Sequence, residues 1–257
     1  MRTLKLTIAY DGSEYAGWQR QINALTIQQI VEEAFAHFTD GEPPTVSGAG
    51  RTDAGVHALG QVASVNVEFD HSAAAVMRAL NVRLPDAIRV IGAVDAAPGF
   101  HARFHATGKS YRYRIARARV LSPFERRYSW HVPWALDLDA MRVAAAQLVG
   151  RHDFASFQAG GTTITATIRN LERLELVEVG AELHILAEGE GFLRHMVRII
   201  TGTLVEIGSG QRDPASIRAL VAARNRDEAG KTAPPHGLTL VAVRYSHVGC
   251  RSVIEGR

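Results

Sequence analysis

Short runs in which apolar and polar residues alternate recur along the whole chain, and they constrain the fold more than any other feature. In residues 62–69, Ala63, Val65 and Val67 share one face of an extended chain, while Glu68 lies on the other. This two-residue period is typical of a strand that buries one face. Strands are predicted in this manner at residues 4–9, 62–69, 88–94, 100–105, 111–115, 168–179, 183–188 and 238–245. The strands at residues 168–179 and 183–188 are predicted to form a hairpin around Gly180.

Apolar residues three and four positions apart separate many of these strands and predict helices. Ile27, Val31, Ala34 and Phe35 have this spacing and follow Thr26, whose hydroxyl is a suitable N-cap. Helices are predicted at residues 26–38, 72–80, 138–149, 192–207 and 214–223.

The order of these elements predicts an α+β chain in two similar halves. The first half comprises residues 1–100 and the second residues 101–245, and no low-complexity linker separates them. A tail of residues 246–257 follows, and its last four residues spell a common engineered protease-cleavage site. The tail is therefore left out of the functional interpretation.

The composition limits the compartment in which such a chain would work. Hydrophobic residues make up 46% and charged residues 21% of the 257 positions, which is enough apolar material for a core. Cys250 is the single cysteine, so an internal disulfide and a thiolate metal cluster are excluded. No apolar run approaches the roughly 18 residues needed to span a bilayer. We therefore expect a cytoplasmic protein that does not contact membranes.

The basic residues permit a nucleic-acid partner without demanding one. The formal net charge is only +3, and most of the 29 basic residues are arginines. The planar guanidinium matches phosphate and stacks on bases. A genome rich in G and C would also raise the arginine content, so charge alone leaves an ordinary solvated surface open.

A glycine-rich stretch between two predicted strands places opposite charges two residues apart. Gly48, Gly50 and Gly55 flank Arg51 and Asp53, and the glycines allow tight turns and close approach of a ligand. By itself this pattern is more typical of a tight turn with a surface ion pair than of a binding loop.

Nucleotide-binding loops and metal sites do not fit the pattern. The run Gly108-Lys109-Ser110 has Arg103 where a phosphate loop has its first glycine, and it leads into a predicted strand instead of a helix. His101 and His105 lie too far apart on a predicted strand to be paired metal ligands, and no carboxylate cluster accompanies them. We expect no metal.

Longer motifs on both sides of Asp53 point to one family. In chain order they are YDG at residues 10–12, GWQ at 17–19, GRTDAGVHA at 50–58, FHARF at 100–104, YRY at 111–113, HDF at 152–154, GFLRHMVR at 191–198 and PPHGL at 234–238. Together they extend over residues 1–245, and the chain resembles the tRNA pseudouridine synthase A family. The family's reaction detaches uracil from ribose, turns it and rejoins it through C5, which requires no redox change or cofactor.

The resemblance implies a role for three residues. Asp53 matches the catalytic nucleophile, and Arg198 matches the cation that keeps this carboxylate ionised. Arg51 is a second candidate for this cationic partner, because it lies nearer to Asp53 in the sequence. Tyr111 matches the residue that stacks on the target base, while Tyr113 on the same strand face is expected in the core.

The resemblance also implies a fold and partners. It predicts two mixed α/β halves around a mainly antiparallel sheet, with the catalytic cleft between them. The expected substrate is uridine at positions 38, 39 and 40, in the anticodon stem-loop of tRNA, and the expected assembly is a homodimer.

Arginines interleaved with aromatic residues should bind the RNA. The site candidates are Arg103, Arg112 and Arg114, with His57 as a hydrogen-bonding or RNA-contacting residue. The wider set comprises Arg20, Arg78, Arg83, Arg117, Arg119, Arg126 and Arg127, with Trp18, Tyr128 and Trp130 near some of them, and residues 112–127 form the densest basic run.

Two other functions remain compatible with the sequence. One is an RNA-binding protein or RNA chaperone that keeps the scaffold without turnover, although such a protein would be expected to lose Asp53, Tyr111 or Arg198. The other is a related uridine isomerase that acts at a different RNA position.

Overall fold

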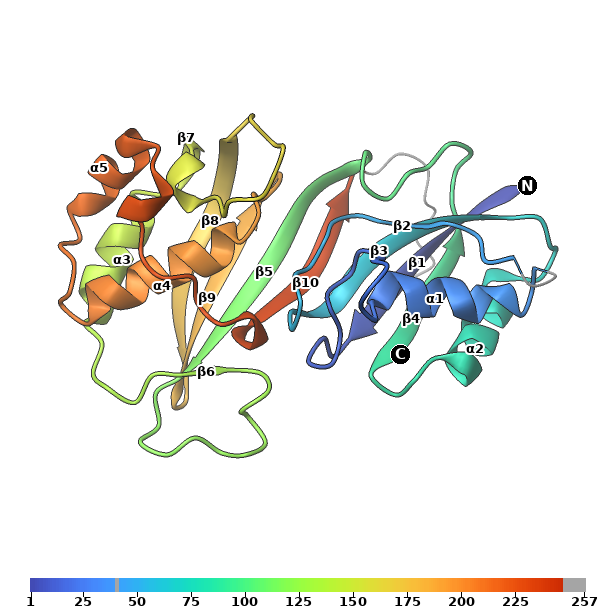
Figure 1. Cartoon of the computed structure of the whole chain (residues 1–257), viewed down its shortest axis with the longest axis horizontal. Helices are drawn as coiled ribbons and strands as arrows, with labels where there is room; N and C mark the ends of the chain where they lie inside the picture. Colours follow the sequence, from blue (N-terminus) through green and yellow to red (C-terminus); the bar gives the residue numbers. More distant parts are fainter. Residues whose placement is uncertain (40–41, 247–257) are drawn as a thin grey trace, which may run out of the picture.

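A single ten-stranded sheet runs through both halves of the chain (Figure 1). The computed structural model describes residues 1–39 and 42–246, so most of the predicted tail, including the cleavage-site sequence and Cys250, lies outside the described residues. The strands are β1 (Arg2–Tyr10), β2 (Val46–Gly48), β3 (His57–Val67), β4 (Ile88–Asp95), β5 (Ala106–Ala116), β6 (Trp130–His131), β7 (Gly150–Asp153), β8 (Ile168–Val179), β9 (Glu182–Gly189) and β10 (Leu238–Tyr245).

The strand order across the sheet is β4-β1-β3-β10-β5-β9-β8-β7, with β2 added to β3 and β6 added to β5. The pairings are antiparallel except for β3 with β10 and β5 with β6. The prediction of an α+β chain around a mainly antiparallel sheet is confirmed, as is the hairpin of β8 and β9 around Gly180, whose φ is +57°.

Strand β10 joins the two halves and thereby assembles the site. Leu240 on β10 is the register partner of Ala58 at the start of β3 and of Tyr111 on β5. The loop that carries Asp53 enters β3 at His57. The pairing therefore brings that loop close to Tyr111, although the two lie far apart in the sequence.

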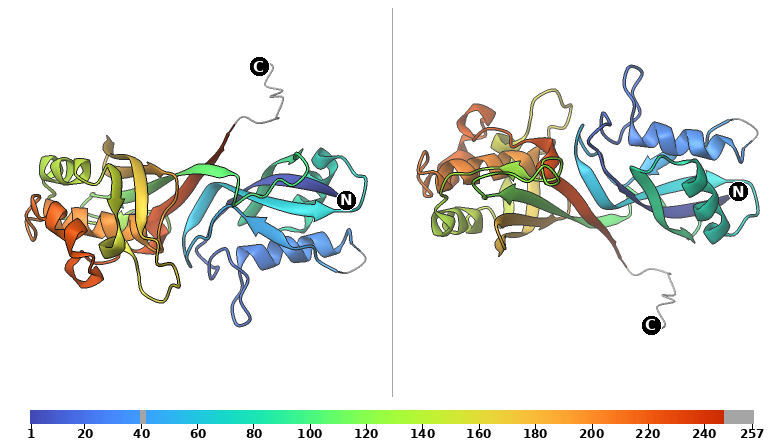
Figure 2. Two further views of the ribbon diagram at one scale, coloured as in Figure 1. Left: turned by 90° about the horizontal axis from the view of Figure 1, so that it is seen from above. Right: turned by 90° about the horizontal axis from the view of Figure 1, so that it is seen from below.

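Five α-helices cover the sheet, in positions close to those predicted. They are α1 (Ile27–Ala36), α2 (Ala73–Arg83), α3 (Leu138–Ala146), α4 (Met196–Gly208) and α5 (Ser216–Ala223), with short 3₁₀ turns η1 (Ala155–Phe157), η2 (Arg226–Glu228) and η3 (Pro235–Gly237). The hydroxyl of Thr26 caps α1 by accepting the N–H of Gln29 at 3.4 Å, as expected. Helices α1 and α4 lie on the same side of the sheet, one over each half (Figure 2).

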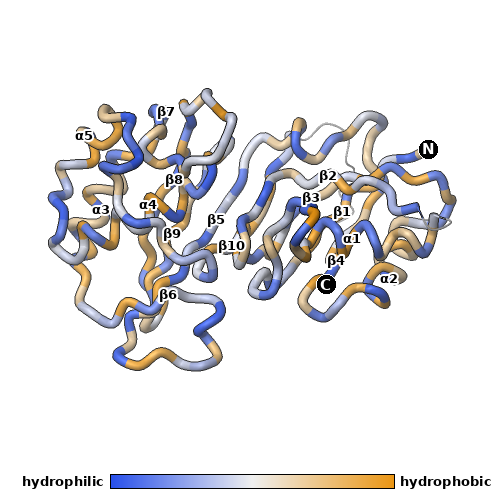
Figure 3. The backbone as a smooth tube through the Cα atoms, in the orientation of Figure 1, coloured by the Kyte–Doolittle hydropathy of each residue, from blue (hydrophilic) through white to orange (hydrophobic). Residues whose placement is uncertain are grey.

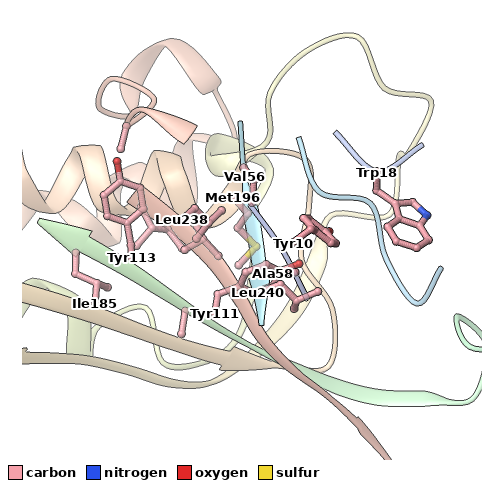
Figure 4. Close-up of a cluster of buried hydrophobic side chains, with 14 of the residues drawn as sticks. Tyr10, Trp18, Val56, Ala58, Tyr111, Tyr113, Ile185, Met196, Leu238 and Leu240 are labelled. Carbon is pink, nitrogen blue, oxygen red and sulfur yellow. The ribbon is translucent and has the colours of Figure 1, made fainter. Parts of the chain in front are cut away.

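One apolar core extends across both halves. Hydrophobic positions recur along α4 and the strands behind it, whereas β5 is mostly hydrophilic or neutral in hydropathy (Figure 3). At the junction, Tyr10, Trp18 and Val56 from the first half lie in the same buried cluster as Tyr111 and Met196 from the second (Figure 4). This shared core holds the two halves in a fixed relation around β10.

Two predicted elements differ from the structure. Residues 100–105 form turns and no strand, because their backbone N–H groups do not pair with a neighbouring strand: His105 N–H donates to the His101 carbonyl, and Ala102 N–H donates to the side-chain Oγ of Ser64. The predicted alternation in burial does not hold, since Ala102 is buried while Phe104 is 74% exposed. The helix predicted from residue 192 begins only at Met196, since the preceding His195 has a left-handed backbone with φ of +60°.

Candidate active site

The segment after β1 contacts the loop that carries Asp53 through a backbone hydrogen bond. Trp18 N–H donates to the carbonyl of Thr52 at 3.0 Å, and Val56 N–H donates to the carbonyl of Asp53 at 3.1 Å. Gly17 has a φ of +91°, and a Cβ at this position would lie 2.5 Å from the Thr52 carbonyl oxygen. Glycine is therefore required where the two segments meet.

A buried hydrogen bond fixes the residue next to Asp53. The hydroxyls of Tyr10 and Thr52 lie 2.8 Å apart, and Thr52 is only 6% exposed. Burial raises the pKa of Tyr10 well above its usual range, so this hydroxyl stays protonated. Because Thr52 points inward, the neighbouring Asp53 is free to face the other half.

Two side chains from the start of α4 converge on one oxygen of Asp53. Arg198 Nη1 lies 3.1 Å and His195 Nε2 lies 3.4 Å from Asp53 Oδ2. Arg198 is itself oriented by a bond from its Nε to the carbonyl of Ala233 at 2.9 Å. Within the described residues Oδ1 has no hydrogen-bond partner, so one oxygen of the carboxylate is held and the other is available.

These partners keep Asp53 ionised. Burial raises the pKa of the Asp53 carboxyl, but the hydrogen bond and charge of His195, together with the Arg198 guanidinium, outweigh this effect and hold the pKa below its ordinary 3.8. The Asp53 side chain remains 30% exposed. The site therefore presents a carboxylate that is charged at neutral pH and accessible from outside.

His195 was not predicted as a site residue. Its left-handed backbone costs roughly 1 kcal/mol for a residue with a Cβ, and such strain gathers at functional sites. The available signal was spacing, because residues three apart on a helix share a face and His195 precedes Arg198 by three positions.

Tyr111 lies beside Asp53 but is almost covered. Its ring is 8% exposed and packs edge-on against Phe192 at a centroid distance of 5.0 Å. Burial, and then the negative charge of Asp53, raise the pKa of the Tyr111 hydroxyl. Because so little of Tyr111 is exposed, stacking of a base on its ring requires the side chains that cover it to move. Tyr113 is fully buried, as expected, and donates to the Pro234 carbonyl at 2.7 Å.

Arg51 does not occupy the position of a partner to Asp53. Its Nε donates to Gln19 Oε1 at 3.1 Å, and the ion pairs of Asp53 in the described part of the chain are those with His195 and Arg198. Arg51 is exposed at the rim of the site. Its predicted role as charge partner is therefore corrected in favour of Arg198.

Two of the residues predicted to bind RNA lie away from Asp53. Arg112 and Arg114 alternate with Tyr111 and Tyr113 on β5, so they point to the opposite face of the sheet. Arg114 there forms ion pairs with Glu125 and Glu182. These carboxylates occupy its guanidinium, which argues against the predicted phosphate contact.

His57 has a structural environment. It is 4% exposed, its Nδ1 accepts the N–H of Gly12 at 3.1 Å, and its Nε2 lies 2.9 Å from the Arg127 carbonyl and 3.1 Å from the His236 carbonyl. Of the two roles expected for His57, hydrogen bonding is the one this geometry supports. Several arginines of the wider set are also paired: Arg20 with Glu32, Arg117 with Glu178 and Arg127 with Glu14.

Neither a metal centre nor a membrane span is found in the described parts of the chain. No group of three or more His, Cys, Asp or Glu side chains in residues 1–39 and 42–246 could hold a metal ion. Over the same residues, no helix combines the length and the apolar character that crossing a bilayer requires.

A family model described as tRNA pseudouridine synthase matches residues 6–105 and 144–246. With a carboxylate presented beside a tyrosine at the junction of two α+β halves, the chain belongs to the tRNA pseudouridine synthase family.

Its relatives cover the chain over almost its full length. The chain is 46% identical over 256 residues to the tRNA pseudouridine synthase A of Syntrophotalea carbinolica, with all of both chains covered. It is 48% identical over 245 residues to that of Geobacter sulfurreducens, covering 95% of this chain and 100% of the relative. For the Bacillus pumilus protein of the same name, identity is 45% over 250 residues, with 95% and 99% covered.

A solved structure, a chain of a Cbf5-Nop10-Gar1 complex, is similar with a TM-score of 0.36 and 10% identity, covering 92% of this chain and 57% of that chain. A likeness of that size supports no conclusion about this chain.

Proposed function

We propose that this protein isomerises uridine to pseudouridine in tRNA, at positions 38, 39 and 40 of the anticodon stem-loop, with Asp53 as the catalytic nucleophile. The observation that carries the proposal is the pair of contacts from His195 and Arg198 to a single oxygen of Asp53, which leaves Oδ1 for the substrate. Membership of the family supports the tRNA substrate.

The chemistry needs only what this site provides. The C1′–N1 bond breaks, a C1′–C5 bond forms, C5 loses its proton and N1 gains one, so atoms and electrons balance without an oxidant or energy donor. Three roles fit Oδ1 of Asp53: attack on C1′, attack on C6, or removal of a sugar proton. In each role the carboxylate must be ionised at neutral pH, which is the state that Arg198 and His195 favour.

Tyr111 would border the base in this reaction. Its hydroxyl remains protonated because burial raises its pKa, so in this state it can donate a hydrogen bond to the base. Phe192 packs against its ring, and the side chains that cover Tyr111 would have to move for full stacking. We also infer that the enzyme works in the cytoplasm as a homodimer without metal or cofactor, and that the cleft between the halves holds the target nucleotide.

Mapping pseudouridine in tRNA after incubation with the purified protein tests the proposal. Product at positions 38 to 40 is the expected result. Product at other positions would indicate a related isomerase with a different site, and tRNA binding without product would indicate an RNA-binding protein that does not turn over.

A further inference from the structure

Lys109 lies on the active-site side of β5, and neither the motifs nor the ion pairs described above account for it. It precedes Tyr111 by two residues, and the pairing of β5 with β9 is regular from Lys109 onward, so the two side chains share a face. A Cβ added to Gly50 would lie 3.0 Å from Lys109 Cε. The lysine stem therefore packs beside the loop that carries Asp53, three residues before that carboxylate.

In the described part of the chain the ammonium of Lys109 has no carboxylate partner, whereas several arginines do. Arg114, Arg198 and Arg20 each contact a carboxylate within ion-pair distance. Among the described residues, Lys109 has no carboxylate within 4.0 Å, and neither have Arg103 and Arg51.

The surroundings of Lys109 also disfavour its charge. Burial lowers the pKa of its ammonium, and the positive charge of Arg103 lowers it further. Arg51 follows Gly50 directly and is exposed, as is Arg103. Positive side chains that lie close together and have no carboxylate partner are stabilised when a ligand brings an anion to them.

We propose that Lys109, with Arg103 and Arg51 beside it, binds a backbone phosphate of the RNA strand that delivers the target nucleotide to Asp53. The inference rests on the proposed function and names the substrate contact on one side of the site. Two residues along a strand span about 7 Å. A nucleotide whose base borders Tyr111 therefore has its own backbone within reach of the Lys109 side chain, whereas Arg112 between them points to the other face of the sheet.

A charge substitution at Lys109 separates phosphate binding from a packing role. Lys109→Met keeps an unbranched apolar stem beside Gly50 and removes the charge, Lys109→Arg keeps the charge, and Arg142→Gln removes one positive charge from α3, where Arg142 is paired with Asp139. The affinity of each protein for an anticodon stem-loop RNA is measured at several salt concentrations, with the rate at saturating RNA and the unfolding midpoint.

For Lys109→Met we expect affinity to fall about three- to tenfold and the slope of log K against log salt to become shallower by about 0.7, the value for one single-strand phosphate contact. The rate at saturating RNA should change less than the affinity, and Lys109→Arg and Arg142→Gln should keep the wild-type slope.

An unchanged slope in Lys109→Met, or an equal loss in Lys109→Arg, would overturn the phosphate contact. If Lys109→Met does not fold, Lys109→Gln replaces it in the same measurement. A wild-type protein that binds the RNA without forming pseudouridine would instead overturn the proposed function, so the two failures are distinguishable.

Discussion

Alternating residues of one short stretch of β5 lie on opposite faces of the sheet, and the two faces have different surroundings. On one face, Lys109 packs beside Gly50 in the loop that carries Asp53, and Lys109 has no counter-ion within the described residues. On the other face, Arg114 is held between Glu125 and Glu182. Both arginines of β5, Arg112 and Arg114, lie on this second face.

This difference shows that a basic residue is informative only together with its partners. A surface ion pair already satisfies its guanidinium and adds little attraction for RNA. A half-buried cation without a carboxylate is less stable alone and is stabilised by an incoming anion. The comparison can be tested by removing charges from each face and from the start of α4.

The largest effect is expected from Arg198→Met. The loss of the guanidinium leaves Asp53 in its partly buried position with a weaker cationic environment, so the isomerisation rate should fall by about 10²–10³-fold. Its pKa, held below 3.8 in the wild type, should rise. The rate of the variant should then fall as the pH is lowered through a range in which wild-type Asp53 remains ionised.

Single-turnover rates measured across pH test this expectation. Arg198→Lys keeps a positive charge and should recover part of the rate. A wild-type rate in Arg198→Met, or an identical acid limb in both proteins, would contradict the assigned role of Arg198.

An intermediate effect is expected at His195, where the backbone strain offers a matched pair of variants. His195→Gly removes the donor to Asp53 and relieves the left-handed backbone, so it should slow the reaction about tenfold, equal to roughly 1.4 kcal/mol, while raising the free energy of unfolding by roughly 1 kcal/mol. Asparagine tolerates the left-handed region and keeps an N–H donor, so His195→Asn should be faster than His195→Gly.

Rate and unfolding free energy changing in opposite directions is an outcome that a purely structural histidine would not produce. If His195→Gly were both more stable and fully active, the contact with Asp53 would have no part in the reaction.

The smallest effect on the reaction is expected from Arg114→Gln on the opposite face of β5. This change leaves Glu125 and Glu182 without their shared cation and should lower the free energy of unfolding by roughly 1–3 kcal/mol. The affinity for tRNA and its salt dependence should stay at wild-type values, and Arg112→Gln serves as the neighbouring control. A weaker salt dependence in Arg114→Gln would show that RNA reaches this face after all.

Much of the fold could be predicted from the sequence, because periodicity reports burial directly. The hairpin around Gly180 and the cap of α1 by Thr26 both depend on local residues, and both are present. The strand predicted at residues 100–105 was wrong, because there the alternation does not report a buried strand face. Ala102 packs into a small cluster with Ala49 and Val62 while the backbone turns.

The site could be predicted only in part. Similar motifs pointed to Asp53 and Arg198, and the structure places these two side chains 3.1 Å apart. His195 was missed because its role depends on its own left-handed backbone just before α4, and hydrophobic periodicity does not predict such a conformation. Arg51 was a second candidate for the partner of Asp53 because it is near in sequence, yet the loop turns its guanidinium toward Gln19.

The central claim is that Asp53 carries out the isomerisation, and replacing only its charge tests this most directly. Asp53→Asn keeps the shape of the side chain, and Asp139→Asn makes the same change on the exposed start of α3. Pseudouridine at positions 38 to 40 is measured under single-turnover conditions, together with tRNA affinity. The account predicts no product and near wild-type binding for Asp53→Asn, with full activity for Asp139→Asn. Product formed by Asp53→Asn at the wild-type rate would contradict it.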